Sequence, residues 1–472
     1  MAEAFRYVQL ADSLQARIAE GAFVAGDRLP SIRTLRRQTG YSISTVSQAL
    51  EELDRRGWVQ SRPRSGYFVR ARPLTPPPRV SRSSLKPRPA TLHALTESIV
   101  QATGRPGWVA LGGAAVSPDL LPLSRLGRAA RDVLSDDPGL VARYTEAAGT
   151  AGLRAEIAKR SHFGGRVLDA DDVVITHGCM DAIRLCLMAV AKPGGVVAIE
   201  SPTFFGFLQL LRDLDMRAVE IPCDPQTGLD IDALERTLSE HAIDALIVTP
   251  SVQNPLGARM PPAHGQRLLA LARRHRFAVI EDDVYGDLAF GDARPVPLAA
   301  MDPGGAVLYC SSFSKTLAAG LRLGWAVPGA HRDRVAQLKL SSSICSPALN
   351  QAIVERFIAE GAYDRHLRKL RLSLRRQLEA VREAVVRHFP AGTRLSAPTG
   401  GFVLWVQLPR AIDGAELYAA AARHEVAVMP GAVCSMTKRY DACLRLSCGH
   451  PFTDRTEAGL ATLGELVRRR LG

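Results

Sequence analysis

The sequence predicts a chain of two unlike parts: a small N-terminal α+β domain with three helices and a β-hairpin, and a larger α/β domain with a mostly parallel sheet. Its 472 residues are too many for one ordinary core. A proline-rich segment follows a strongly basic N-terminal part, and beyond it short β-rich runs alternate with helical stretches. Hydrophobic residues make up 46% of the chain, which excludes a wholly disordered protein.

The positive charge is concentrated near the N-terminus. Residues 1–90 carry 16 Lys and Arg against 7 Asp and Glu, a net charge of +9 out of +13 for the whole chain. All but one of these basic residues are arginine, whose planar guanidinium suits bidentate contacts to phosphates and base edges. Charge alone leaves two alternatives open, a polyanion-binding module and a merely solvated surface.

The N-terminal elements follow from hydrophobic periodicity and from helix-end signals. Apolar residues spaced for one helical face predict a first helix over residues 7–20. Ser31 and Gly40 bound a second, and a third runs from Ser42 or Ser44 to Arg56. Two strands, 58–62 and 67–70, then flank a turn at 63–66. Three helices and a basic hairpin predict a winged helix-turn-helix; the alternative is a small helical protein-interaction domain.

The stretch GDRLPSIRTLRRQTGYSISTVSQALEELDRRGWVQSRPRSGYFV resembles the GntR-type DNA-binding domain along its full length. The resemblance implies a DNA-binding domain over residues 1–70. Ile43 is a departure, because many relatives carry arginine near this point, so the operator sequence cannot be carried over. The DNA contacts implied by the resemblance are Arg33 before the third helix, Ser42, Ser44 and Thr45 at its start, and Arg62, Arg64 and Gly66 in the wing.

A linker is predicted over residues 71–90, which contain six prolines, five basic residues and no acid. The remaining domain, 91–472, contains β-rich runs separated by helical stretches, as in a parallel sheet covered on both faces. The predicted strands are 173–176, 196–200, 245–249, 278–281, 307–311 and 323–327.

Polar and aromatic residues recur where these strands end, at the sheet edge where ligands bind in such folds. They are Gly178, Phe204, Asn254, Asp282 and Lys315. A lysine there can form a Schiff base with an aldehyde, and an aspartate can pair with a protonated pyridine nitrogen. Taken singly, Lys315 would be a surface lysine and Asp282 a helix-capping acid.

From about residue 108 to the end the chain resembles fold type I aminotransferases, particularly kynurenine and aminoadipate aminotransferases. SFSKTLAAGLRLG and TPSVQNPLG are the most specific motifs. The resemblance implies pyridoxal 5′-phosphate, a smaller C-terminal α+β subdomain from about residue 350, and catalytic roles for Lys315 and Asp282. The other implied contacts are Asn254 and Tyr285 to the ring oxygen, Phe204 stacked on the ring, Gly178, Cys179, Met180, Ser312, Ser314 and Arg322 at the phosphate, Tyr144 from the other subunit, and Arg445 to the substrate carboxylate.

Two positions depart from that family. Cys179-Met180 replaces the commoner Ser-Gln or Ala-Gln, so a glutamine contact to the phosphate is lost while backbone contacts remain. Phe204 replaces the commoner tyrosine, which keeps the stacking and drops a hydroxyl. Neither change removes the chemistry.

A GntR-like domain, a linker and an aminotransferase-like domain together resemble the MocR subgroup of bacterial transcription regulators. This resemblance implies a DNA-binding homodimer with exchanged N-terminal domains, whose larger domain responds to an amine or amino acid through a Schiff base at Lys315. The alternative is an active aminotransferase with an accessory DNA-binding domain. Charges near the start argue against a signal peptide, so we expect a cytoplasmic protein without membrane contact. The eight cysteines show no C-x-x-C spacing and predict reduced core residues and no metal site.

Overall fold

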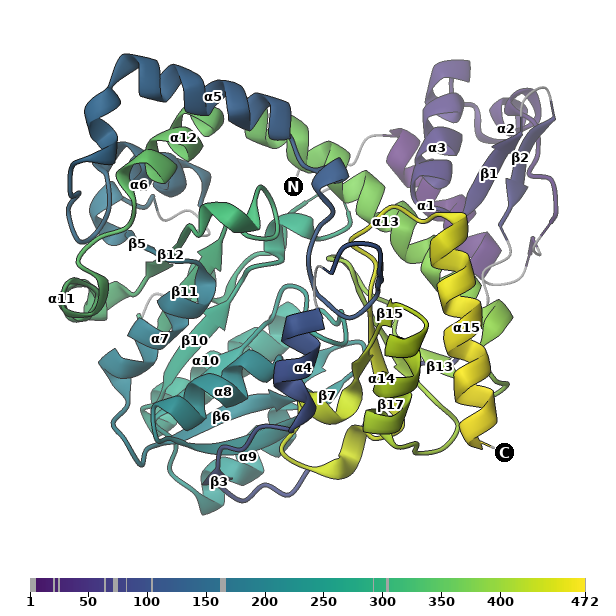
Figure 1. Cartoon of the computed structure of the whole chain (residues 1–472). Coiled ribbons are helices and arrows are strands. Elements are labelled where there is room, and N and C mark those ends of the chain that lie inside the picture. Colours follow the sequence, from purple (N-terminus) through teal and green to yellow (C-terminus); the bar gives the residue numbers. More distant parts are fainter. Residues whose placement is uncertain are drawn as a thin grey trace. The chain divides into compact units, whose positions relative to one another are not determined.

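The computed structural model divides the chain between Thr75 and Pro76 into two compact units, which are described separately (Figure 1). The predicted linker, 71–90, therefore falls on both sides of this division. The structure describes residues 6–19, 22–23, 26–62, 65–70, 75–81, 83–102, 105–161, 167–291, 293–302 and 305–471.

The first unit has the predicted order of three helices followed by a hairpin. Ser31 and Ser42 cap the second and third helices, because each side chain accepts a hydrogen bond from a backbone N–H three residues on. Gly40 ends the second helix with φ +72°, a left-handed conformation that suits glycine. The elements are α1 (Arg6–Ala19), α2 (Ile32–Thr39), α3 (Ile43–Arg55), β1 (Val59–Arg62) and β2 (Gly66–Val69), with β1 and β2 antiparallel.

A single cluster of apolar side chains forms the core of this unit. The apolar positions of α1 and α3 that the periodicity singles out lie in it, which explains why these helices pack together. The buried members are Leu10, Ala11, Leu14, Leu29, Leu35, Val46, Ala49, Leu50, Leu53, Val59 and Val69. The winged helix-turn-helix prediction is therefore confirmed.

The second unit is built on a large mixed sheet with strand order β3-β7-β6-β9-β10-β11-β12-β5. Neighbours from β7 to β11 are parallel, β12 is antiparallel to both its neighbours, and β3 is antiparallel to β7. The predicted strands are all present. The bounds are β3 (Arg88–Pro89), β5 (Val174–Thr176), β6 (Val196–Ser201), β7 (Arg217–Asp224), β9 (Ala245–Val248), β10 (Ala278–Asp282), β11 (Val307–Ser312) and β12 (Gly324–Val327).

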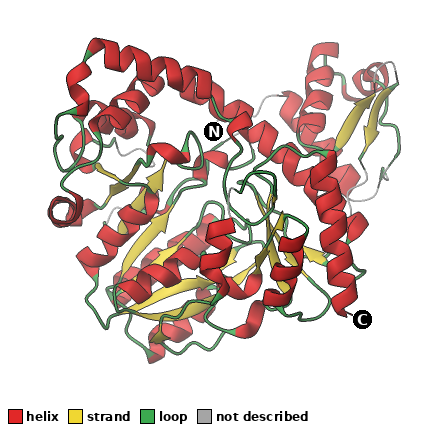
Figure 2. Cartoon of the chain, viewed as in Figure 1, coloured by secondary structure: helices red, strands yellow, loops and turns green. Residues whose placement is uncertain are grey.

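Alternate residues of the parallel strands point to opposite faces, and both faces are covered by helices (Figure 2). Ile199, Ile247 and Ile280 belong to the apolar cluster that includes α7 (Cys179–Val190) and α8 (Phe205–Asp213). Their neighbours Ala198, Leu246 and Val279 belong to the cluster that includes α9 (Ile231–Glu240) and α10 (Pro262–His275). Continuous apolar strands are thus explained by burial on both sides.

The C-terminal part forms a smaller α+β subdomain, as predicted. Its antiparallel sheet has the order β13-β14-β17-β16 and packs with the long helix α13 and with α14 and α15. The bounds are α12 (Ala348–Ala359), α13 (Ala362–His388), β13 (Arg394–Leu395), β14 (Val403–Gln407), α14 (Gly414–Arg423), β15 (Val426–Ala427), β16 (Met429–Pro430), β17 (Cys443–Ser447) and α15 (Asp454–Leu471).

The remaining segments join these two sheets. β4 (Val109–Ala110) pairs with β15, so this segment, which precedes the helix over residues 123–136, is hydrogen-bonded to the small subdomain. Within the described residues, no helix is long and apolar enough to cross a membrane. The other elements are α4 (Leu95–Ala102), α5 (Leu123–Asp136), α6 (Ala151–Arg160), β8 (Gly228–Leu229) and α11 (Arg332–Ser343).

Candidate functional site

The predicted site residues gather at the carboxyl-terminal edge of the large sheet. Asp282 ends β10, Ser312 ends β11, and Lys315 follows three residues later. On the far side of β12, Gly178 follows β5 and begins α7. Because β10 and β11 are parallel neighbours, their ends bring the carboxylate and the lysine loop to one place.

Lys315 is a partly buried amine with an unusual environment. Its Nζ donates a hydrogen bond to the backbone oxygen of Ala114 at 2.5 Å. Burial, reinforced by the nearby positive charge of Arg445, lowers the pKa of Lys315 to about 8. A larger fraction of the amine is therefore neutral, and hence nucleophilic, near neutral pH than for an exposed lysine.

Asp282 is buried, and its carboxylate is held by two donors. The Cys179 thiol lies 3.2 Å from Oδ1, and the backbone N–H of Val284 donates to the same oxygen at 3.2 Å. Burial raises the pKa of Asp282 to about 6 despite these hydrogen bonds. Burial also raises the pKa of Cys179 well above its ordinary value, so the sulfur keeps its proton and acts as the donor.

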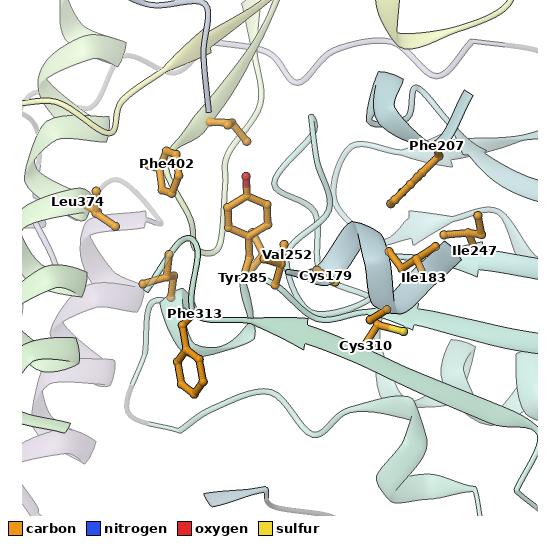
Figure 3. Packing of buried hydrophobic residues seen from close by; sticks show 14 of the residues in the cluster. Cys179, Ile183, Phe207, Ile247, Val252, Tyr285, Cys310, Phe313, Leu374 and Phe402 are labelled. Atoms are coloured by element: carbon orange, nitrogen blue, oxygen red, sulfur yellow. The ribbon is translucent and has the colours of Figure 1, made fainter. Parts of the chain in front are cut away.

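The buried polar atoms that have no partner among the described residues include Tyr285 Oη and Asn254 Oδ1, which follow β10 and β9, and Arg445 Nε on β17 of the small subdomain. The Tyr285 ring packs edge-on against Phe402, with ring centroids 5.6 Å apart, beside Val252 (Figure 3). Arg445 donates from Nη2 to the backbone oxygen of Gly112 at 2.6 Å. Buried polar atoms are normally hydrogen-bonded, so the unpartnered atoms of Tyr285, Asn254 and Arg445 indicate that a polar ligand binds here.

A second group of residues forms an anion-binding corner. Gly178 has φ +87°, and the Arg322 guanidinium donates to the oxygen of His177 at 2.9 Å. A Cβ at Gly178 would lie 2.8 Å from Arg322 Nη2, so the guanidinium would have to move, and the positive φ itself favours glycine. Ser314 Oγ lies 3.5 Å from Arg322 Nη1, and Ser312 Oγ accepts from the Ser314 N–H. With the N-terminus of α7, which begins at Cys179, this corner suits a phosphate.

Pyridoxal phosphate therefore fits the residues present. Asp282 lies where a carboxylate can meet a pyridine nitrogen, Tyr285 and Asn254 offer unpartnered polar atoms, and the corner at Gly178 and Arg322 suits the phosphate.

The remaining predicted residues are less directly placed. Phe204 is half-buried at the start of α8, where it packs against Phe205 and Phe207 at centroid distances of 4.8 and 5.6 Å. Met180 is also half-buried. Tyr144 is 80% exposed, so its own domain does not enclose it.

Several contacts at the site were not predicted. The oxygens of Gly112 and Ala114 are backbone atoms, which carry no sequence signature. Thr316, beside Lys315, is anchored on α13, since Tyr363 donates to its hydroxyl at 2.7 Å and His366 Nε2 lies 2.8 Å from its oxygen. The thiol contact of Cys179 joins residues 103 positions apart. Seven of the eight cysteines are buried, which confirms that they are core residues.

The candidate nucleic-acid interface lies on the first unit. Arg33, Ser42 and Ser44 are exposed, and Thr45 is half-buried. Arg62 is exposed, with its guanidinium carbon 4.4 Å from the centroid of the Phe68 ring. Gly66 has φ +100°, which favours glycine in the hairpin turn. Arg64, also predicted to contact DNA, lies outside the described residues.

Each of the two units matches a known protein family. Residues 6–69 match the family of bacterial regulatory proteins named gntR. Residues 116–458 match the class I and II aminotransferases.

Known relatives share this arrangement along almost their whole length. The chain is 37% identical over 467 residues to the uncharacterized HTH-type transcriptional regulator YjiR of Escherichia coli K12, covering 99% of both chains. It is 34% identical to the regulator YdcR of the same organism, covering 99% of this chain and 100% of that one. The second unit resembles the crystal structure of LysN, an α-aminoadipate aminotransferase of Thermus thermophilus complexed with N-(5′-phosphopyridoxyl)-L-leucine. That match has a TM-score of 0.74 and 28% identity over 80% of this chain and 95% of that one.

Proposed function

Because the chain belongs to the class I and II aminotransferase family and carries a gntR-family domain before it, as MocR-type regulators do, we propose that it is a DNA-binding transcription regulator controlled by an amine or amino acid. The observation that carries the proposal is the fusion itself, which relatives described as transcriptional regulators share over 99% of this chain. A bacterial regulator of this kind would act in the cytoplasm, where the DNA lies.

Pyridoxal 5′-phosphate is the cofactor of this family, and when bound it supplies an aldehyde that accepts amines and a ring that withdraws electrons. Lys315 is the attachment point, and its lowered pKa favours the neutral amine that attachment needs. Asp282 would pair with the protonated ring nitrogen, and Arg322 with the N-terminus of α7 would hold the phosphate. Arg445 is the buried cation available to an amino-acid carboxylate.

The effector amine would compete with the Lys315 amine for the aldehyde. Lys315 is followed by Thr316, which is fixed to α13 by Tyr363 and His366. A movement of Lys315 would therefore shift the contacts that Thr316 makes with α13. This helix of 27 residues packs against both α12 and the small subdomain. We infer that this helix transmits effector binding within the domain.

We also propose that the regulator acts as a homodimer with exchanged N-terminal domains. The exposure of Tyr144 supports the homodimer, since a tyrosine that is 80% exposed is available to a second subunit's phosphate site, while the exchange of N-terminal domains rests on the MocR resemblance. Paired DNA-binding domains would read paired half-sites.

Transamination is the second candidate function, because Lys315, Asp282 and Arg445 are all retained. The regulator is favoured, since relatives that match along the whole chain are transcriptional regulators.

The test combines spectroscopy with DNA binding. Purified full-length protein should show a visible absorption band of bound cofactor that shifts when amines and amino acids are titrated in. Lys315→Ala should lose the covalently attached cofactor and the amine response while retaining DNA affinity. Conversion to the pyridoxamine form, reversed by a keto acid, would favour the enzyme. Absence of any cofactor band after addition of pyridoxal phosphate would refute the assignment of the larger domain.

A further inference from the structure

The solvent-facing side of helix α3 has an unusual composition for a helix that binds DNA. Its core-facing residues Val46, Ala49 and Leu50 are buried. The exposed residues in the first two turns are Ile43, Ser44 and Gln48, while Thr45 and Ser47 are half-buried. Ser44 and Gln48 are four residues apart and share one side of the helix, whereas Ile43 is its first residue, beside the cap.

Ile43 is the first residue of α3 and its side chain is 52% exposed. It follows the cap Ser42 directly, so it lies in the turn whose side chains contact base edges when such a helix enters the major groove. A branched apolar residue left in water at this place contributes little to the core of its own domain.

The hydroxyl groups around Ile43 are engaged within the helix. Ser42 Oγ accepts from the Thr45 N–H at 3.1 Å and lies 2.8 Å from both Ser44 Oγ and Thr45 Oγ1. Ser47 donates to Glu51 at 3.2 Å. Gln48 is exposed, and its amide forms no hydrogen bond with any described residue.

The helix therefore presents an apolar branched group and a carboxamide. In the major groove the C5-methyl of thymine is the apolar group, and the N6 and N7 atoms of adenine match a carboxamide. Guanine is read most often by arginine or lysine, and the first basic residue of α3 is Arg55 near its end. The start of α3 thus lacks the arginine or lysine that most often reads guanine, and it carries an apolar group suited to thymine and a carboxamide suited to adenine.

We propose that α3 reads A·T base pairs in the major groove, with Ile43 packed on a thymine methyl group and Gln48 bound to the edge of an adenine. Ile43 is then a specificity-determining residue of the DNA-binding domain. This inference rests on the proposed DNA-binding function and adds to it the bases recognised by α3.

The test removes the methyl group from DNA without touching the protein. Duplexes that bind full-length protein are selected from a random library, and each thymine of the selected half-site is then replaced singly by deoxyuridine. At one thymine per half-site the replacement should weaken binding about fourfold, the loss of one buried methyl-sized group. Ile43→Ala should bind thymine and uracil duplexes equally, whereas Ile43→Val should keep most of the difference.

Gln48→Ala provides an independent arm, since it should relax the preference for adenine and leave the uracil effect unchanged. Sequence-specific binding with no sensitive thymine, or selection of G·C pairs opposite α3, would overturn this inference alone. Failure to bind any duplex would instead overturn the proposed DNA-binding function, and this inference with it.

Discussion

At the scale of single residues, the environment of Asp282 is set by a donor from another element. Cys179 starts α7, Asp282 ends β10, and the thiol lies 3.2 Å from the carboxylate. Burial raises the pKa of Asp282 to about 6, and the thiol hydrogen bond opposes that rise because it stabilises the charged form. We infer that Cys179 is a positioning residue for Asp282, the carboxylate proposed to pair with the cofactor nitrogen.

Cys179→Ala should raise the pKa of Asp282 further, so that more of the carboxyl is protonated near neutral pH. Because the charged form is the one that pairs with a protonated ring nitrogen, affinity for pyridoxal phosphate should fall. The loss should be a few-fold near pH 6 to 7 and should shrink as the pH rises well above the shifted pKa. Spectroscopic titration of apoprotein with cofactor between pH 6 and 9 measures it.

Two variants serve as controls for that titration. Cys179→Ser keeps a donor and should restore the affinity. Cys186→Ala removes another buried thiol of α7, one that accepts from Cys310 at 3.7 Å, and should leave the pH profile of binding unchanged. An equal loss at all pH values in Cys179→Ala would contradict the role assigned to the thiol.

At the scale of elements, helix α6 organises the loop that carries Tyr144. Arg154 of α6 is 5% exposed and donates to the oxygen of Gly149 at 3.2 Å, to Glu146 at 3.0 Å and to Asp171 at 2.7 Å. One buried guanidinium therefore holds the end of the loop that adjoins α6 and the segment before β5. We infer that Arg154 maintains the position from which Tyr144 is presented.

Arg154→Met should lower the free energy of unfolding by about 2–3 kcal/mol, because the buried oxygen of Gly149 loses its guanidinium donor and the ion pairs with Glu146 and Asp171 are lost. It should also speed amide hydrogen exchange in residues 142–149. Urea unfolding and exchange of the full-length protein measure the two effects. Arg143→Met is the matched control: this neighbouring arginine pairs with Asp137 while more than half exposed, so it should change stability by less than about 1 kcal/mol. Equal effects of the two variants would contradict the prediction.

At the scale of the whole molecule, the net charge is distributed unevenly between the N-terminal part and the larger domain. The first 90 residues hold +9 of the +13 net charge, and the larger domain is nearly neutral. A polyanion should therefore bind through the N-terminal part, with release of counterions from DNA. If effector binding changes the affinity for operator DNA by some factor, operator binding must change the affinity for the effector by the same factor, because linkage is reciprocal.

Arg33→Gln should reduce the slope of log affinity against log salt by about 0.9, the contribution of one phosphate contact. Affinity should fall to a similar extent on different sequences, because a phosphate carries no base identity. Fluorescence anisotropy between 50 and 200 mM salt, on a selected duplex and a scrambled one, tests both points. Arg410→Gln, at an exposed arginine of the larger domain, should leave the slope unchanged. A wild-type slope near zero would refute electrostatic DNA binding.

The sequence by itself determined the elements and the local motifs. Ser31 and Gly40 mark helix ends, and Ser42 or Ser44 the start of the third helix, because capping involves residues only three or four apart. The strands predicted over 278–281 and 307–311 follow from apolar runs, and the structure extends each by one residue, to Asp282 and Ser312. Lys315, Asn254 and Tyr285 were singled out because their motifs are contiguous in the chain.

Only the tertiary structure decided how these residues are connected. The contact of Lys315 with the oxygen of Ala114 joins residues 201 positions apart, and that of Arg445 with Gly112 joins residues 333 apart. Arg88 pairs with Ala218 on the edge of the sheet, so most of the segment predicted as a linker, residues 76–90, belongs to the larger unit. Backbone oxygens and strand edges are the same for every residue type, so such contacts leave no pattern in the sequence, and packing alone selects them.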